Sequence, residues 1–243
     1  MAQVIRLGTK TYTVTEQTFI KSEYAASERP KNVCGEPIVW KWGTQRLKNE
    51  HAALLLVAAR TSIPVPEVVR LGEHANGALF LETERVYGIE ASEVRNKCRA
   101  PPGHEHVAFG ECTVCENDAA TKVNNFIQTI VLPQLQALTS NMTGLDGFLC
   151  PPQRILEYDS RPTWESRQAT SGEHFVFCHG DLSRMNIMLD ERTLDVVSIL
   201  DWENAGFYPK ELERPVWALN DEEYTAMYHD YAKLQEEIKL ITG

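Results

Sequence analysis

Three polar side chains in the last third of the chain have types and a spacing that suit a metal-assisted reaction on phosphates. Asp181 and Asn186 lie five positions apart between two strand-like segments, and Asp201 ends a further strand-like segment after fourteen intervening residues. A strand, a turn and a second strand of that length bring Asp201 back beside Asn186. We therefore expect two carboxylates and one amide oxygen to converge in a cleft, where hard oxygen ligands suit Mg²⁺ shared with nucleotide phosphates.

With an Asn and one Asp on a metal ion, the remaining carboxylate is free to accept a proton from a hydroxyl group. One Asp as base beside an Asn and an Asp on the metal is the arrangement of phosphoryl transfer. The competing interpretation is an Asp and an Asn that merely cap loops.

The same residues, taken with their neighbours, resemble a known family. The pattern His-x-Asp-x-x-x-x-Asn, followed by an Asp at the end of a strand and a Trp, is met at His179, Asp181, Asn186, Asp201 and Trp202. It is similar to the aminoglycoside phosphotransferase and choline kinase-like family, a branch of the protein-kinase-like fold. The resemblance implies that Asp181 is the general base and that Asn186 and Asp201 bind Mg²⁺. It implies that His179 belongs to the catalytic loop, where it holds the shape of the loop.

The resemblance covers about residues 38–217, is strongest over residues 177–209, and is greatest to fungal members of the family, whose substrates are unassigned. It implies an α+β, two-lobed fold, with a small β-rich N-terminal lobe over residues 1–88 and a larger, mainly helical C-terminal lobe over residues 89–243. It also implies a small-molecule kinase that moves the γ-phosphate of ATP or GTP, with Mg²⁺, to a hydroxyl group of its acceptor.

The N-terminal half supplies candidates for nucleotide binding that fit this resemblance. Lys41 ends a strand-like run and resembles the lysine that pairs with the α- and β-phosphates, and Glu50 on the following helix resembles its ion-pair partner. Glu84, Arg85 and Val86 lie in a segment that resembles the hinge between lobes, where backbone groups receive the base of the nucleotide. The alternative for Lys41 and Glu50 is that they are surface residues, as a Lys on a strand and a Glu on a helix usually are.

The phosphate-binding loop is the main departure from the family pattern, because only Gly8 and Gly35 precede Lys41. Two further interpretations therefore stay open beside the kinase. One is a pseudokinase or nucleotide-binding scaffold without turnover. The other is a kinase fold used for non-phosphoryl biosynthetic chemistry.

The acceptor is expected beside the catalytic loop, where carboxylates and aromatic rings suit a cationic, amine-bearing small molecule. The candidate residues on that side are Ser183, Trp202, Glu203, Phe207 and Tyr208. The alternative for the aromatic members is that Trp202 and Phe207 belong to the core.

A second group of metal-binding residue types lies outside these motifs. Cys98, Cys112 and Cys115 have the spacing C-x₁₃-C-x₂-C, with His104 and His106 between the first two cysteines. Three thiolates and one imidazole, from His106 or His104, would form a closed tetrahedral site for structural Zn²⁺. The alternative is that these cysteines are free and serve as small buried apolar residues.

Composition limits the classes of protein that need to be considered. The chain has 243 residues, 24 Lys and Arg, and 34 Asp and Glu, and its net charge is −10. This acidity argues against a nucleic-acid partner, and the longest apolar run, residues 52–59, is too short to span a membrane. Because no secretory signal is visible at the start, a cytoplasmic, reducing compartment with free thiols is expected for the six cysteines.

These functional residues need a framework of strands and helices to position them. Runs that mix β-branched and aromatic residues between turn-forming residues predict strands at 4–7, 12–15 and 37–42. Residues 68–71 and 78–82 predict a hairpin around residues 74–77, and short strand-like runs follow at 175–178, 186–189 and 194–200. Apolar residues at helical spacing predict helices at 45–60, 91–98, 118–139 and 221–241. Residues 22–35 are polar and predict a loop.

Overall fold

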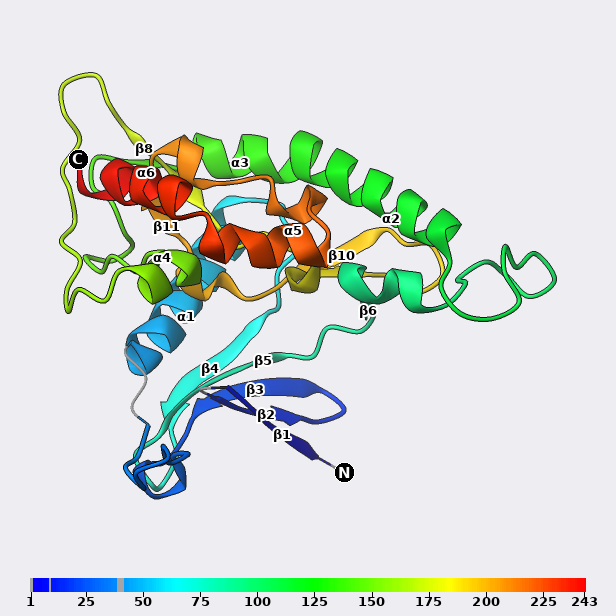
Figure 1. Ribbon diagram of the computed structural model, residues 1–243, viewed down its shortest axis with the longest axis horizontal. Helices are drawn as coiled ribbons and strands as arrows, with labels where there is room; N and C mark the ends of the chain where they lie inside the picture. Colours follow the sequence, from blue (N-terminus) through cyan, green and yellow to red (C-terminus); the bar gives the residue numbers. More distant parts are fainter. Residues whose placement is uncertain (1, 9, 39–41) are drawn as a thin grey trace.

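The structure is a computed structural model that describes residues 2–8, 10–38 and 42–243. An antiparallel sheet occupies one end of the molecule, and most of the helices lie at the other end (Figure 1). Helix α1 (Gly43–Arg60) lies between the two regions and packs against both. The predicted strand at 37–42 is replaced by an isolated bridge at Pro37 and by the start of α1 at Gly43; residues 39–41 lie outside the described part.

Neighbouring strands of the N-terminal sheet are antiparallel, and in the described residues their order is β1-β2-β3-β5-β4. The second and third strands are joined by a tight turn in which the Oγ1 of Thr15 accepts a hydrogen bond from the N–H of Thr18. The third strand, in which Lys21 pairs with Leu81, was not predicted from the sequence. The bounds are β1 (Gln3–Leu7), β2 (Lys10–Val14), β3 (Thr18–Glu23), β4 (Val68–Glu73) and β5 (Leu79–Glu84).

Helix α1 buries one face against the sheet and the other region. Leu47, Leu54 and Val57 on this face are at most 2% exposed, as successive spacings of seven and three residues predict for one face of a helix. The helix ends at Arg60, where the Thr61 hydroxyl donates to the carbonyl of Val57 and extended backbone leads on to Pro64.

Two small antiparallel sheets carry the motifs of the C-terminal region. Their strand orders are β10-β9-β6 and β11-β8-β7. Three of these strands were predicted from the sequence: β8 (Phe175–Cys178), β9 (Ile187–Leu189) and β10 (Val196–Ile199). The other three were not predicted: β6 (Ile89–Glu90), β7 (Thr139–Ser140) and β11 (Gly206–Tyr208).

The long predicted helix at 118–139 is present, and it starts earlier. It comprises α2 (Thr113–Phe126), a π-helical turn η3 (Ile127–Val131) and α3 (Leu132–Ala137). Pro133 has no N–H to donate to the preceding turn, so the hydrogen-bond pattern widens there without breaking the helix. The predicted helix at 91–98 is the shorter 3₁₀-helix η2 (Ala91–Asn96).

The predicted single helix at 221–241 is wrong, because the chain forms α5 (Asp221–Ala226), the 3₁₀ turn η8 (Met227–His229) and α6 (Tyr231–Thr242). The side chain of Asp230 accepts a hydrogen bond from the N–H of Lys233 and begins a new helix. Tyr231 therefore turns to solvent, and only part of the predicted aromatic stripe reaches the core.

The remaining short elements connect these parts: η1 (Ala26–Glu28), α4 (Gln153–Tyr158), η4 (Arg184–Asn186), η5 (Trp202–Asn204), η6 (Lys210–Leu212) and η7 (Val216–Ala218). Within the described ranges, no helix combines the length and the apolar character that a membrane span would require.

Candidate active site

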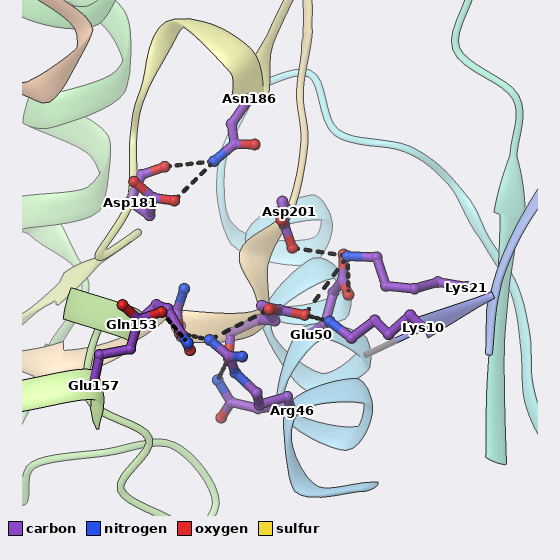
Figure 2. A network of polar contacts seen from close by, with 12 residues as sticks. Lys10, Lys21, Arg46, Glu50, Gln153, Glu157, Asp181, Asn186 and Asp201 are labelled. Atoms are coloured by element: carbon purple, nitrogen blue, oxygen red, sulfur yellow. Dashed lines mark hydrogen bonds and ion pairs between the residues drawn. The ribbon is translucent and has the colours of Figure 1, made fainter. Parts of the chain in front are cut away.

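The loop after β8 brings two of the predicted site residues into contact. Asn186 lies in the turn η4, and its Nδ2 donates to the main-chain oxygen of Asp181 at 2.7 Å and to its Oδ2 at 3.4 Å (Figure 2). The carbonyl of Asn186 accepts a hydrogen bond from the N–H of Leu200 at 2.8 Å. Because Leu200 precedes Asp201, this bond places the third predicted residue beside the loop.

His179 is a buried support of this loop. Its Nε2 lies 2.9 Å from the carbonyl of Leu200, so this nitrogen carries the proton, and Nδ1 accepts the N–H of Asp181 at 3.2 Å. Burial lowers the pKa of His179 to about 4, which keeps the ring neutral. The imidazole thus joins the segments that carry Asp181 and Asp201 and is a positioning residue.

The backbone of the loop is also held by groups from distant elements. Gly180 has φ +85°, and a Cβ there would lie 2.8 Å from the carbonyl oxygen of Asn204, so only glycine fits. The carboxylate of Glu213 accepts the N–H groups of His179 and Gly180. Arg154, paired with Glu237 at 2.9 Å, donates to the carbonyl of Gly180.

Asp181 has the ionisation properties of a base that works near neutral pH. Burial raises its pKa to about 6, although a 2.8 Å hydrogen bond from the Tyr224 hydroxyl to Oδ1 favours the carboxylate. The nearby charge of Asp201 raises the pKa further. A carboxylate with this pKa is ionised at pH 7 and still binds a proton readily.

Lys21 of β3 links Asp201 to helix α1. Its Nζ lies 2.8 Å from Oε2 of Glu50 and 2.7 Å from Oδ1 of Asp201 (Figure 2). Burial alone would raise the pKa of Asp201, but the charges of Lys21 and Lys10 outweigh it and hold this pKa well below its usual range. Asp201 is therefore a carboxylate throughout the neutral range.

A second set of charges extends this network from α1 to η5. Glu203 accepts hydrogen bonds from Lys10 and lies 3.4 Å from Arg46. Arg46 of α1 also donates a hydrogen bond to the side chain of Asn204. Asn49 of α1 donates to the carbonyls of Glu203 and Ala205. Three cations and three carboxylates thus balance each other in a largely buried cluster: Lys10, Lys21, Arg46, Glu50, Asp201 and Glu203.

Asp201 itself has an unusual backbone conformation. Its φ of 58° and ψ of 59° lie in the left-handed region, which costs most residues free energy but is tolerated by Asp and Asn. This conformation ends β10 sharply and turns the chain into η5.

One cavity of about 340 Å³, within the usual range for small-molecule sites, is lined by several of these residues. Its lining includes Lys21, Glu50, Asn186 and Asp201, and also Glu84, Arg85 and Val86. The apolar lining comes from the sheet, from α1 and from the segments around η4, β9 and the end of β10, and includes Tyr12, Val14, Phe19, Leu54, Leu81, Met185, Met188 and Leu200.

Glu50 of the predicted ion pair binds Lys21, a residue outside the predicted site. The predicted partner, Lys41, lies outside the described residues. The run Thr18-Phe19-Ile20-Lys21 contains the β-branched and aromatic residues of a strand and could have indicated Lys21.

The predicted acceptor residues do not form one surface. Trp202 and Tyr208 are fully buried in the core, and Glu203 belongs to the ion network, so the structure differs from the prediction that these side chains face an acceptor. Phe207 packs edge-on against Phe177. Ser183 alone lines a second hollow, of about 200 Å³, together with Arg184, Met185, Val216, Leu219, Asp221, Tyr224 and Thr225.

Comparison with known proteins identifies the family. Residues 37–211, more than two thirds of the chain, match the sequence profile described as the phosphotransferase enzyme family. The chain belongs to this family. None of the curated proteins compared with the chain is a match. The α+β, two-lobed kinase-like fold and the family predicted from the sequence are thus confirmed.

Several solved structures are similar to this phosphotransferase-family chain. One is an aminoglycoside-3′-phosphotransferase of type VIII, at 20% identity and a TM-score of 0.47, with 96% of this chain and 86% of the other covered. A GDP complex of a variant aminoglycoside 2′-phosphotransferase-IIIa has 14% identity and a TM-score of 0.48, with coverages of 99% and 80%. An aminoglycoside phosphotransferase from Streptomyces rimosus has 14% identity and a TM-score of 0.43, with coverages of 99% and 90%.

Proposed function

We propose that this phosphotransferase-family protein transfers the γ-phosphate of ATP or GTP to a hydroxyl group of a small molecule and requires Mg²⁺. The observation that carries the proposal is that Lys21, Asn186 and Asp201 line one cavity of 340 Å³, while the half-buried carboxylate of Asp181 lies beside Asn186. Lys21 supplies a cation for the phosphates. Asn186 and Asp201 supply two oxygen donors for a metal ion, and Asp181 supplies a base.

The base of the nucleotide fits the apolar part of the cavity. Phe19 and Leu81 on the sheet and Met188 on β9 line this part. The N–H groups of Glu84 and Arg85 donate to other main-chain oxygens of the described protein, at 2.8 Å each, so we assign the N–H contact with the base to Val86.

Asn186 and Asp201 have the donor set that Mg²⁺ prefers. Since the Nδ2 of Asn186 binds Asp181, its Oδ1 remains for a cation, and the carboxylate of Asp201 is held ionised beside it. When bound, Mg²⁺ neutralises charge on the transferred phosphoryl group. Lys21 holds Asp201 in place and faces the phosphates.

The carboxylate of Asp181 accepts the hydroxyl proton of the acceptor as the acceptor oxygen attacks the γ-phosphorus, and the bond from the γ-phosphorus to the β-phosphate oxygen breaks to release ADP or GDP. The hollow lined by Ser183 and Tyr224 adjoins this residue and is where we place the acceptor. Its Asp221 carboxylate and Tyr224 ring suit a cationic acceptor.

Nucleotide binding and turnover are tested separately. Calorimetric titration with ATP and GTP, with and without Mg²⁺, should show Mg²⁺-dependent binding, and a library of hydroxyl compounds should then yield a phosphorylated product. Asp181→Asn should retain nucleotide affinity and lose about 10²–10⁴ in transfer rate, whereas Asp195→Asn, at an exposed site, should match the wild type.

Each failure has its own meaning. Phosphate transfer by Asp181→Asn at the wild-type rate would show that Asp181 is not the base. Nucleotide binding without any phosphorylated product would favour the scaffold, and products that lack phosphate would favour non-phosphoryl chemistry. Absence of ATP and GTP binding would overturn the proposal as a whole.

A further inference from the structure

The segment between η2 and α2, residues 97–112, projects from the body of the protein as a long loop (Figure 1). It contains neither helix nor strand, and loops of this length are uncommon in compact domains. The outer part of the loop has little apolar packing: Phe109 is 95% exposed and residues 101–106 are all exposed, whereas Cys98, Val107 and Cys112 at its base pack against the core. The conformation of the loop therefore depends on the contacts at its base.

Three cysteines and one histidine meet at the base of this loop. The Nδ1 of His106 lies 3.7 Å from the Sγ of Cys98, 3.6 Å from that of Cys112 and 3.5 Å from that of Cys115. The Sγ atoms of Cys98 and Cys115 are 4.0 Å apart. All four ligand atoms lie within 4.8 Å of one another.

These separations are those of the corners of a metal-centred tetrahedron. Zn–S bonds of about 2.3 Å and Zn–N bonds of about 2.0 Å give tetrahedral edges of about 3.8 Å between sulfurs and about 3.5 Å between sulfur and nitrogen. A disulfide would need sulfurs about 2.05 Å apart. We propose that Cys98, His106, Cys112 and Cys115 bind one structural Zn²⁺.

The surroundings of the sulfurs suit thiolates. The N–H of Arg99 donates to the Sγ of Cys115 at 3.2 Å, and the N–H of His106 donates to the Sγ of Cys98 at 3.3 Å. Such donors offset the charge of coordinated thiolates and orient the ligands. Simple apolar packing of cysteines would not require an imidazole nitrogen in contact with three sulfurs.

The metal would fix the start of α2 next to the catalytic loop. Cys112 precedes α2 and Cys115 lies in its first turn. The following residue, Glu116, pairs with Arg184 of η4 at 3.3 Å. The site is therefore structural, with four protein ligands and no open position, and is separate from the Mg²⁺ site proposed for catalysis.

Metal analysis of the full chain tests the inference directly. Protein expressed with added zinc and purified under reducing conditions without chelator should contain about one Zn²⁺ per chain. Cys112→Ser should lose the metal and melt at a lower temperature, and the matched control Cys34→Ser, at an exposed thiol away from the cluster, should keep both. A content below about 0.2 equivalents in the wild type would overturn the inference.

A spectroscopic test works even where a cysteine variant fails to fold. Replacement of the metal by Co²⁺ in the wild type should produce the visible absorption of a tetrahedral cobalt thiolate site. His106→Cys should retain the metal and change this spectrum, since three sulfurs become four, while His104→Cys should leave it unchanged. A spectrum that responds to His104→Cys and not to His106→Cys would refute the ligand set, as would the absence of thiolate absorption.

Discussion

The Tyr224 hydroxyl of α5 donates a hydrogen bond of 2.8 Å to Oδ1 of Asp181, while Asn186 approaches Oδ2 of the same carboxylate at 3.4 Å. Both oxygens of the proposed base therefore face a donor. These donors favour the ionised form and oppose the burial that raises the pKa of Asp181 to about 6. Helix α5 thus takes part in setting the pH range in which the proposed base is ionised.

Tyr224→Phe should move the acidic limb of the pH profile of kcat/KM to higher pH. Asp181 must be ionised to accept a proton, so activity falls as the pH drops through its pKa, and loss of the hydroxyl donor raises that pKa. Tyr228→Phe is the matched control, because it removes a hydroxyl that contacts Tyr224, at 3.4 Å, instead of the hydroxyl that binds Asp181. An unchanged limb, or a shift to lower pH, would contradict the role of the hydrogen bond.

Lys21→Met should impair both stability and transfer. Removal of this cation leaves Glu50 and Asp201 without the charge that they share, and breaking a buried pair costs about 3–5 kcal/mol. Urea unfolding measures the first effect, and the rate of phosphate transfer under folding conditions measures the second. Lys41→Met is the comparison: if it proves the more damaging of the two, the lysine predicted from the sequence is the functional one.

Asp201 offers a way to separate backbone strain from chemistry. Asp201→Asn and Asp201→Ala should both lose Mg²⁺-dependent nucleotide binding, because each removes the carboxylate. Only the alanine is disfavoured at φ 58°, so we expect it to be about 1 kcal/mol less stable than the asparagine. Equal unfolding free energies would show that the left-handed conformation relaxes in the variants.

Glu213 should make stability depend on pH in the weakly acidic range. Burial raises its pKa from 4.5 to about 7, so the folded protein holds this proton more tightly than the unfolded chain. The stability that protonated Glu213 contributes to the folded protein is fully present below about pH 4.5 and is lost as the pH rises to about 7. Glu213→Gln should flatten this decline, as measured by urea unfolding at both ends of the window; an unaltered slope would exclude Glu213 as its source.

The C-terminal motif was predictable because its chemistry is local in sequence. The spacing of Asp181 and Asn186 fixes them on one turn, and the strand before Asp201 returns it to that turn. The predicted strands at 68–71, 78–82 and 175–178 also formed, and the first two pair as the predicted hairpin around residues 74–77.

The missed features depend on contacts between distant segments. Lys21 gains its role from Glu50 and Asp201, which are 29 and 180 positions away, and no pattern near Lys21 encodes those partners. Tyr224 and Glu213 likewise contact the catalytic loop only through the packing of the C-terminal elements. Trp202, an aromatic residue beside a functional Asp, is buried because η5 turns it inward between Phe177 and His179.

The attachment of α1 to the segment after β10 has a mechanical consequence. Glu50 reaches Asp201 through Lys21, Arg46 binds Glu203 and Asn204, and Asn49 binds the carbonyls on either side of Asn204. An outward tilt of this one helix would strain every one of these links at the same time. Displacement of α1 from η5 would therefore disturb the positions of Asp201, Glu203 and Asn204 together rather than one contact at a time.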